Sequence, residues 1–219
     1  SNPTPEFSDQ IEYLVFNPFW YVPSSIVRRE LLPALQKNDS YLSANRYELL
    51  ADGQAIAPEE VDFSSVDFSQ FPYRIRQKPG SHNALGAVKF LFPNPLNIYL
   101  HDSPAKNLYA RPKRAFSHGC IRLEDPDVLA RALLEKDAGW TESQINSTIS
   151  GGKRHQVNLD ETVPIHLAYF TVRVMDSGDV AFFDDIYDRD FAHLERYLQA
   201  ATASDSAEDP ATLASPDTT

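Results

Sequence analysis

The chain has 219 residues and a formal net charge of −11 at pH 7. Hydrophobic residues make up 42% and aromatic residues 11%, which is enough to build the core of a globular domain. The lack of a basic surplus argues against a nucleic-acid partner, because phosphates are neutralised by Lys and Arg side chains. A single cysteine excludes an internal disulfide and any zinc site made of several thiolates.

The two ends of the chain differ in composition from the part between them. The sequence opens on "SNPTPEF", and we expect residues 1–6 to be a flexible N-terminus whose first two residues resemble an expression scar. Residues 201–219 are acidic and poor in apolar residues, which predicts a disordered tail. We find no signal peptide and no run of about 18 apolar residues, and we expect the chain to be a fragment of a longer protein.

The first third of the chain predicts a strand, a helix and an irregular segment. Residues 11–23, "IEYLVFNPFWYVP", are aromatic and β-branched, which is typical of a strand. Residues 24–37 predict a helix with Ser24 or Ser25 as its N-cap. Residues 38–71 are polar and irregular, and a structureless loop of this length is improbable in a compact domain. We therefore expect a small inserted capping subdomain there.

The middle of the chain predicts three strands followed by two helices. The strand segments are "YRIRQKPG", "ALGAVKFLFP" and "NIYLHD", separated by Pro and Gly, at residues 73–80, 84–93 and 97–102. A helix follows with Asp125 as N-cap and Pro126 at its first position. A second helix begins at the capping box "TESQ", residues 141–144, and ends at two glycines.

The last elements predicted are a hairpin and a helix. Residues 163–187 read as two strands that turn at Ser177 and Gly178. Residues 188–199 have the pattern of a helix. Together the elements indicate a strand-dominated α+β domain.

The only cysteine lies in "SHGCIRLEDP" between polar residues that alternate with apolar ones. If this segment is extended, His118, Cys120 and Arg122 point to one side. In "NIYLHD", Tyr99 and His101 likewise point away from the core. If the two segments are neighbouring strands, one surface carries all five side chains.

These residue types suit nucleophilic catalysis by a thiolate. A nearby imidazole lowers the pKa of a cysteine by forming a thiolate–imidazolium pair, and a third group fixes the tautomer of that imidazole. Gly119 lets the backbone approach a substrate closely, and successive N–H groups there can form an oxyanion hole. Arg122 can hold a carboxylate through paired N–H donors.

Other interpretations of the same residues stay open at this point. A lone cysteine is most often a small buried hydrophobe. Cys120, His101, His118 and Asp102 also have the chemistry of zinc ligands, but no usual paired ligand spacing is present. The local cysteine signatures of papain-like and caspase-like proteases do not occur. The serine elbow, the dinucleotide fingerprint and the phosphate loop are missing as well.

The segment "SHGCIRL" with the upstream "IYLHD" resembles the catalytic motif of L,D-transpeptidases, the YkuD-type domain. Further stretches such as "NPFWYVP" and "YRIRQKPG" resemble the large periplasmic branch of that family from Gram-negative bacteria. The resemblance covers roughly residues 7–190. It implies a catalytic domain over residues 7–200 that is a mixed β-sandwich, with a partly helical capping insertion at about 38–71.

The resemblance also implies roles for individual residues. Cys120 matches the nucleophile and His101 the general base, which the backbone carbonyl of Asp102 would orient. Family members often have glycine or serine at the position of Asp102, so the role of its side chain stays open. His118 would shape the pocket beside the oxyanion, and the N–H groups of Gly119 and Cys120 would bind it.

Substrate contacts are implied for Arg122, Tyr99, Ser117 and Trp20. Arg122 would support the substrate or the loop, and Tyr99 and Trp20 would line the donor site. For Trp20 a place in the core is an equal alternative. The remaining histidines match no motif position, and we expect them to be surface or structural residues: His82, His155, His166 and His193.

The function implied is that of a peptidoglycan L,D-transpeptidase. Cys120 would attack the third-residue carbonyl of a tetrapeptide stem and release D-alanine, and the acyl group would pass to a diamino-acid amine to form a 3–3 cross-link. No metal or organic cofactor is needed, and carbapenem-type inhibitors would acylate the cysteine.

Two alternatives to cross-linking remain. The first is a thiol hydrolase that acts on stem peptides or on links between lipoprotein and peptidoglycan. The second is a catalytically idle wall-binding module. The resemblance further implies the periplasm of a Gram-negative bacterium, with a parent protein that is anchored in the inner membrane or exported. The oligomeric state is left open.

Overall fold

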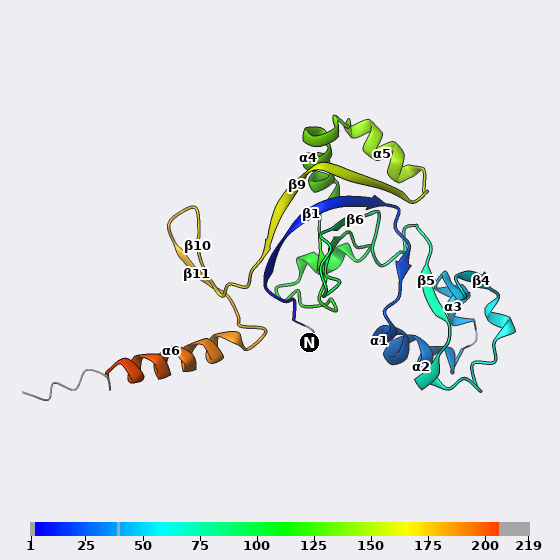
Figure 1. The fold of residues 1–219 in the computed structure, drawn as a ribbon, viewed down its shortest axis with the longest axis horizontal. Coiled ribbons are helices and arrows are strands. Elements are labelled where there is room, and N and C mark those ends of the chain that lie inside the picture. Colours follow the sequence, from blue (N-terminus) through cyan, green and yellow to red (C-terminus); the bar gives the residue numbers. More distant parts are fainter. Residues whose placement is uncertain (1–2, 39, 206–219) are drawn as a thin grey trace, which may run out of the picture. The chain divides into compact units, whose positions relative to one another are not determined.

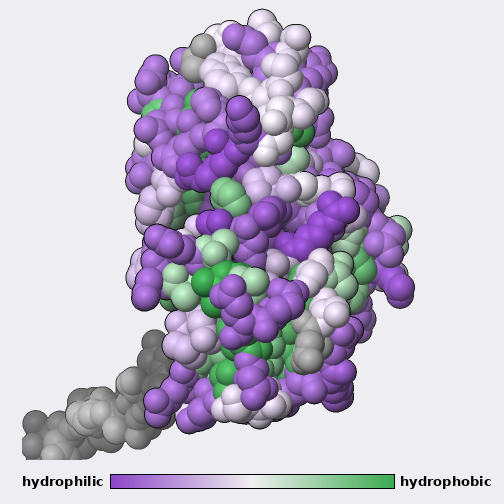
Figure 2. Space-filling view, turned by 90° about the vertical axis from the view of Figure 1, so that its right-hand side faces the viewer, coloured by the Kyte–Doolittle hydropathy of each residue, from purple (hydrophilic) through white to green (hydrophobic). Residues whose placement is uncertain are grey.

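The computed structural model describes residues 3–38 and 40–205, which form a strand-rich α+β fold, as predicted. The chain divides into two compact units, one over Asn2–Leu167 and one that begins at Ala168. Figure 1 traces the elements of both units in chain order. The face drawn in Figure 2 is largely hydrophilic and is interrupted by apolar patches.

The first unit contains a five-stranded sheet, which we call the main sheet, with the strand order β8-β7-β6-β1-β9. Its members are β1 (Phe7–Phe16), β6 (Val88–Leu91), β7 (Leu100–His101), β8 (Ile121–Arg122) and β9 (His155–Leu167). Neighbouring strands are antiparallel except β7 and β8, which are parallel. The sheet is therefore mixed, and its parallel pair joins the two segments that carry the candidate catalytic residues.

Two helices, α4 (Pro126–Ala138) and α5 (Glu142–Ser150), close the core of the main sheet. They contribute buried side chains that pack with those of β1, β6 and β7, among them Leu14, Phe16, Phe90, Leu100, Leu134 and Ile145. Burial of each such side chain contributes about 1.5–3 kcal/mol to folding. The predicted capping box of Thr141 and Gln144 is confirmed. Asp125 is the N-cap of α4, as predicted, although its side chain makes no capping hydrogen bond.

A second core lies in residues 20–77, which we call the small module. Its sheet has the order β2-β5-β3-β4 and consists of β2 (Trp20–Tyr21), β5 (Arg74–Gln77), β3 (Tyr47–Ala51) and β4 (Gln54–Ile56). Its helical segments are α1 (Ser24–Ile26), the π-helical turn η1 (Val27–Leu31), α2 (Leu32–Leu35), α3 (Tyr41–Ala44) and the 3-10 turns η2 (Pro58–Glu60) and η3 (Phe68–Gln70). The segment predicted as an insertion, 38–71, thus supplies the inner strand β3 and the edge strand β4, and the residues that flank it supply β2 and β5.

Several predicted boundaries are wrong for local reasons. The strand predicted over 11–23 is two strands, because Asn17 has a left-handed backbone (φ 48°) and Pro18 follows it. The N-cap of the helix at Ser24 is Pro23, so neither serine caps it. The strand predicted over 84–93 is confined to β6, since residues 83–86 form a turn closed by Gly86 N donating to Asn83 O over 2.8 Å.

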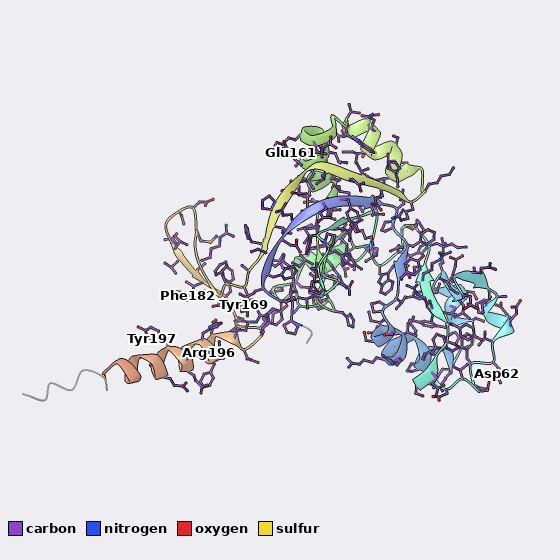
Figure 3. The ribbon with its side chains drawn as sticks, in the orientation of Figure 1. Asp62, Glu161, Tyr169, Phe182, Arg196 and Tyr197 are labelled. Atoms are coloured by element: carbon purple, nitrogen blue, oxygen red, sulfur yellow. The ribbon has the colours of Figure 1, made fainter. Side chains whose placement is uncertain are left out.

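The second unit consists of a hairpin and a helix. Strands β10 (Val172–Val174) and β11 (Val180–Phe182) form the predicted turn around Gly178. The predicted start of the first hairpin strand, at residue 163, is wrong, because residues 163–167 belong to β9 and pair with β1. Figure 3 labels Tyr169 and Phe182 in this unit. The Tyr169 hydroxyl donates to Asp185 Oδ1 over 2.7 Å.

The predicted termini fall partly within the described chain. Helix α6 (Arg189–Asp205) contains the predicted helix except for Asp188 and extends into the first residues of the predicted tail. The rest of that tail, residues 206–219, and residues 1–2 lie outside the described residues. Near the N-terminus, Thr4 Oγ1 donates to Gly119 O over 2.9 Å. Between residues 3 and 205, leaving out residue 39, no helix has the length and apolar character needed to cross a bilayer.

We predict that Asn83→Ala destabilises the turn before β6. Asn83 is fully buried, donates from Nδ2 to Pro18 O (2.8 Å) and Lys78 O (3.0 Å), and accepts from Leu85 N (2.8 Å). Each buried backbone group left without a partner costs about 1–3 kcal/mol. Urea unfolding should therefore show a loss of about 3 kcal/mol. Asn107→Ala, at an exposed position, is the control and should change stability by less than about 0.5 kcal/mol.

Candidate active site

The parallel pair β7–β8 brings the two motif segments side by side, so the predicted pairing is confirmed. The register aligns Leu100 with Ile121 and His101 with Arg122. Ile121 N donates to Tyr99 O over 3.2 Å, and Leu123 N donates to His101 O over 2.8 Å. Continued by one residue, this register sets Cys120 beside Tyr99.

Residues two apart in a strand share a face, so Tyr99 and His101 lie on the same side of β7. Their ring centroids are 5.8 Å apart. The imidazole is only 5% exposed, so the strand presents a buried base rather than one in open solvent.

His101 is held by the carbonyl of the next residue. Its Nδ1 lies 2.5 Å from Asp102 O. A carbonyl oxygen can only accept, so Nδ1 carries the proton and Nε2 keeps a free lone pair. This is the orienting contact that the family resemblance implied for Asp102.

Burial lowers the pKa of His101 to about 4, because it penalises the imidazolium form. The hydrogen bond to the Asp102 backbone opposes that shift, and the positive charges of Arg122 and Lys89 add to it. At neutral pH the imidazole is uncharged and can accept a proton.

Cys120 is half-buried, and its Sγ lies 3.7 Å from Asn97 O. Burial raises the pKa of the Cys120 thiol, although hydrogen bonds from the Tyr99 backbone and side chain and the charge of Lys89 act in the other direction. Burial thus favours a neutral thiol and a neutral imidazole at rest over the thiolate–imidazolium pair expected from the sequence.

Lys89 is a site residue that the sequence reasoning missed. It pairs with His101 across β6 and β7, and its Nζ lies 5.2 Å from the centre of the Tyr99 ring. Burial lowers the pKa of Lys89. A signal was present in the sequence, since Lys89 stands between the buried Val88 and Phe90 and strand alternation turns it away from the core.

Gly119 has a backbone that only glycine adopts readily, with φ at 120°. A Cβ there would also lie 3.1 Å from Ile98 Cδ1. Its N–H donates to Ser117 Oγ over 3.2 Å, and its carbonyl accepts from Thr4. Ser117 thus shapes the turn before the cysteine, and the Gly119 N–H must leave Ser117 to reach an oxyanion.

His118 and Arg122 have different surroundings. His118 is half exposed, and its Nε2 lies 3.1 Å from Oε1 of Glu30, a residue of the small module. Arg122 Nη2 donates to Phe116 O over 3.5 Å. Its Nε is buried and has no hydrogen-bond partner among the described residues.

Trp20 lies in β2, where it pairs with Gln77 and packs against Tyr47 with ring centroids 6.3 Å apart. These contacts belong to the small module and favour a packing role. Of the other histidines, His155 packs against Trp140 and His166 contacts Ser8, as expected of structural residues. Within the described parts of the chain, no three His, Cys, Asp or Glu side chains gather as metal ligands would.

Comparison with known proteins adds two findings. The family model of the YkuD L,D-transpeptidase catalytic domain matches residues 1–148. A Haemophilus influenzae protein named "Putative L,D-transpeptidase" is 36% identical over 191 residues, which are 87% of this chain and 38% of that protein. The chain thus spans well under half the length of this relative.

We predict that Cys120 reacts slowly with iodoacetamide at pH 7 and faster as the pH rises above the usual thiol pKa of about 8.5. The reason is the raised pKa of the buried thiol, since only the thiolate is alkylated. Tyr99→Phe removes a hydrogen bond that lowers this pKa, so it should slow alkylation further at a given pH.

Samples quenched at set times and analysed by mass spectrometry give the alkylation rates of the wild type and of Tyr99→Phe. Tyr197→Phe, on the exposed side of α6, is the matched control and should leave the rate unchanged. A wild-type rate that is already at its plateau at pH 7 would contradict the neutral resting thiol.

Proposed function

The chain belongs to the L,D-transpeptidase catalytic-domain family, whose substrates are peptidoglycan peptides, and we propose that it is a cysteine acyltransferase that forms 3–3 cross-links. The observation that supports this best is the parallel pair β7–β8. It joins Cys120, Tyr99 and a base, His101, whose Nδ1 is already committed to the Asp102 carbonyl.

In the first step, the Cys120 Sγ attacks the third-residue carbonyl of a tetrapeptide stem. The S–C bond forms as the thiol proton passes to His101 Nε2, so that the neutral pair becomes charged only during the reaction. The C–N bond to D-alanine then breaks, and His101 returns the proton to the leaving amine.

In the second step, the side-chain amine of a diamino acid from another stem attacks the thioester. His101 removes the proton from that amine, the new amide bond forms, and the cysteine leaves and is reprotonated. Because its pKa is lowered, the imidazole is uncharged at neutral pH and can accept this proton, and a pKa closer to neutral when substrate is bound would make the transfer more efficient.

The negative oxygen of each tetrahedral intermediate needs donors. The N–H groups of Gly119 and Cys120 are the proposed pair, and the positive charges of Lys89 and Arg122 would stabilise the oxygen further. Arg122 would contact a carboxylate of the stem through its Nη groups, since the bond from Nη2 to Phe116 O is long at 3.5 Å.

Two further expectations follow from this proposal. The protein would act in the periplasm, because its proposed substrate is the peptidoglycan. Carbapenems would acylate Cys120, because a reactive acyl donor that enters the site meets the same nucleophile. Covalent labelling of the purified chain tests the second expectation directly.

We predict that the wild-type chain converts a disaccharide-tetrapeptide into a dimer that lacks one alanine. Cys120→Ala should abolish this product without loss of fold, and His101→Asn should lower its rate by about 10²–10⁴-fold, the usual contribution of a general base. Mass spectrometry of the product measures all three. Ser150→Ala, at the exposed end of α5, is the control.

A monomer that lacks one alanine would instead mean that water captures the acyl-enzyme, which is the outcome expected of a hydrolase. Unchanged turnover in Cys120→Ala would overturn the assignment of the nucleophile.

A further inference from the structure

The carboxylate of Asp102 is bound on both of its oxygens, although the family resemblance gives this side chain no role. Oδ1 accepts from Ser103 N over 2.6 Å and from Lys106 Nζ over 2.9 Å. Oδ2 accepts from Ala87 N over 2.7 Å. The side chain is only 13% exposed, so water screens these bonds little.

The bond to Ser103 N controls the direction of the carbonyl that holds His101. Asp102 C=O and Ser103 N–H belong to the same peptide group, and in a planar trans peptide they point in opposite directions. A carboxylate that fixes the N–H on one side therefore fixes the C=O on the other. That C=O is the acceptor for His101 Nδ1.

The second carboxylate oxygen, Oδ2, lies against the turn formed by residues 83–86. A Cβ on Gly86 would lie 2.2 Å from Asp102 Oδ2, so the position accepts no side chain while the carboxylate is in place. Gly86 also has φ at +60°, which disfavours other residues. The turn is closed from within by the buried Asn83, which accepts from Gly86 N and Leu85 N.

Lys106 connects the Asp102 carboxylate to the segment that follows Cys120. It lies at the start of η4 (Lys106–Ala110), and its Nζ donates both to Asp102 Oδ1 and to Glu124 O. Glu124 follows β8, the strand that begins directly after Cys120. One ammonium group thus links the turn after the base to the segment after the nucleophile.

We propose that the Asp102 carboxylate is a positioning group for the His101 base, and that Lys106 couples this group to the strand that follows Cys120. The inference rests on the proposed function of the site for its effect on turnover. Its effect on the His101 ring does not, because the tautomer is a property of the free protein.

A purely structural role would predict something else. It would lower the melting temperature and leave the His101 ring in the same tautomer. A positioning role predicts that the imidazole loses its single tautomer when the peptide is released, because Nδ1 no longer has a fixed acceptor.

The test uses ¹⁵N-labelled histidine in the full chain, with the His101 signals assigned by their loss in His101→Asn. In the wild type at pH 7, His101 should be neutral and protonated on Nδ1 alone. In Asp102→Ala it should become a mixture of Nδ1-H and Nε2-H forms. Asp102→Asn keeps one oxygen acceptor for Ser103 N, so its tautomer ratio should lie between those of the wild type and Asp102→Ala. Asp176→Asn, at an exposed turn, is the matched control and should match the wild type.

Turnover of the tetrapeptide is the second readout. A misdirected base should lower kcat by about 10²-fold in Asp102→Ala and leave KM unchanged. If Asp102→Ala does not fold, Asp102→Asn decides the question in the same spectra. A single Nδ1-H tautomer in a folded Asp102 variant would overturn the proposal. A changed tautomer together with a wild type that never releases alanine would support the positioning role and reject the proposed reaction.

Discussion

In the turn after β7, the His101 ring donates from Nδ1 to the carbonyl oxygen of the next residue, over 2.5 Å, and the other features of the site depend on that bond. It leaves Nε2 as the only basic atom of the ring. It also fixes which way the ring faces, and the parallel register of β7 and β8 then determines which residues lie beside it. A rotated Asp102 peptide would keep the same residues in the site but lose the orientation of the base.

Burial gives this arrangement its electrostatic character. A buried imidazole and a half-buried thiol both prefer their neutral forms, so the nucleophile and the base favour an uncharged pair at rest. The positive charges of Lys89 and Arg122 act on this pair and suit an oxygen that becomes negative during acyl transfer. The site is therefore arranged for charge that develops during the reaction rather than for charge that is stored in the cysteine.

The sequence predicted those parts of the fold and site that depend on local patterns. The capping box at Thr141 and the proline at the start of α4 follow from spacing over a few residues. The extended segment expected around Cys120 is confined to Ile121–Arg122, because residues 117–119 form a bend in which Gly119 has φ at 120°. Contacts between distant segments were not accessible in this way. The small module draws β2 and β5 from outside the predicted insertion, and the bond between Ala87 and the Asp102 carboxylate spans fifteen positions. The left-handed backbone of Asn17, followed by Pro18, breaks the strand predicted over 11–23, and the Asn-Pro pair was a local signal for this turn.

The most direct test of the proposed mechanism is to trap the acyl-enzyme on Cys120. The purified chain would be mixed with a disaccharide-tetrapeptide without an acceptor, quenched in acid, digested and mapped by mass spectrometry. The account predicts an acyl adduct, the substrate minus one D-alanine, on the peptide that contains Cys120, and a much smaller amount of it in His101→Asn. Release of alanine with no adduct on Cys120 at any quench time, or an adduct on another residue, would contradict it.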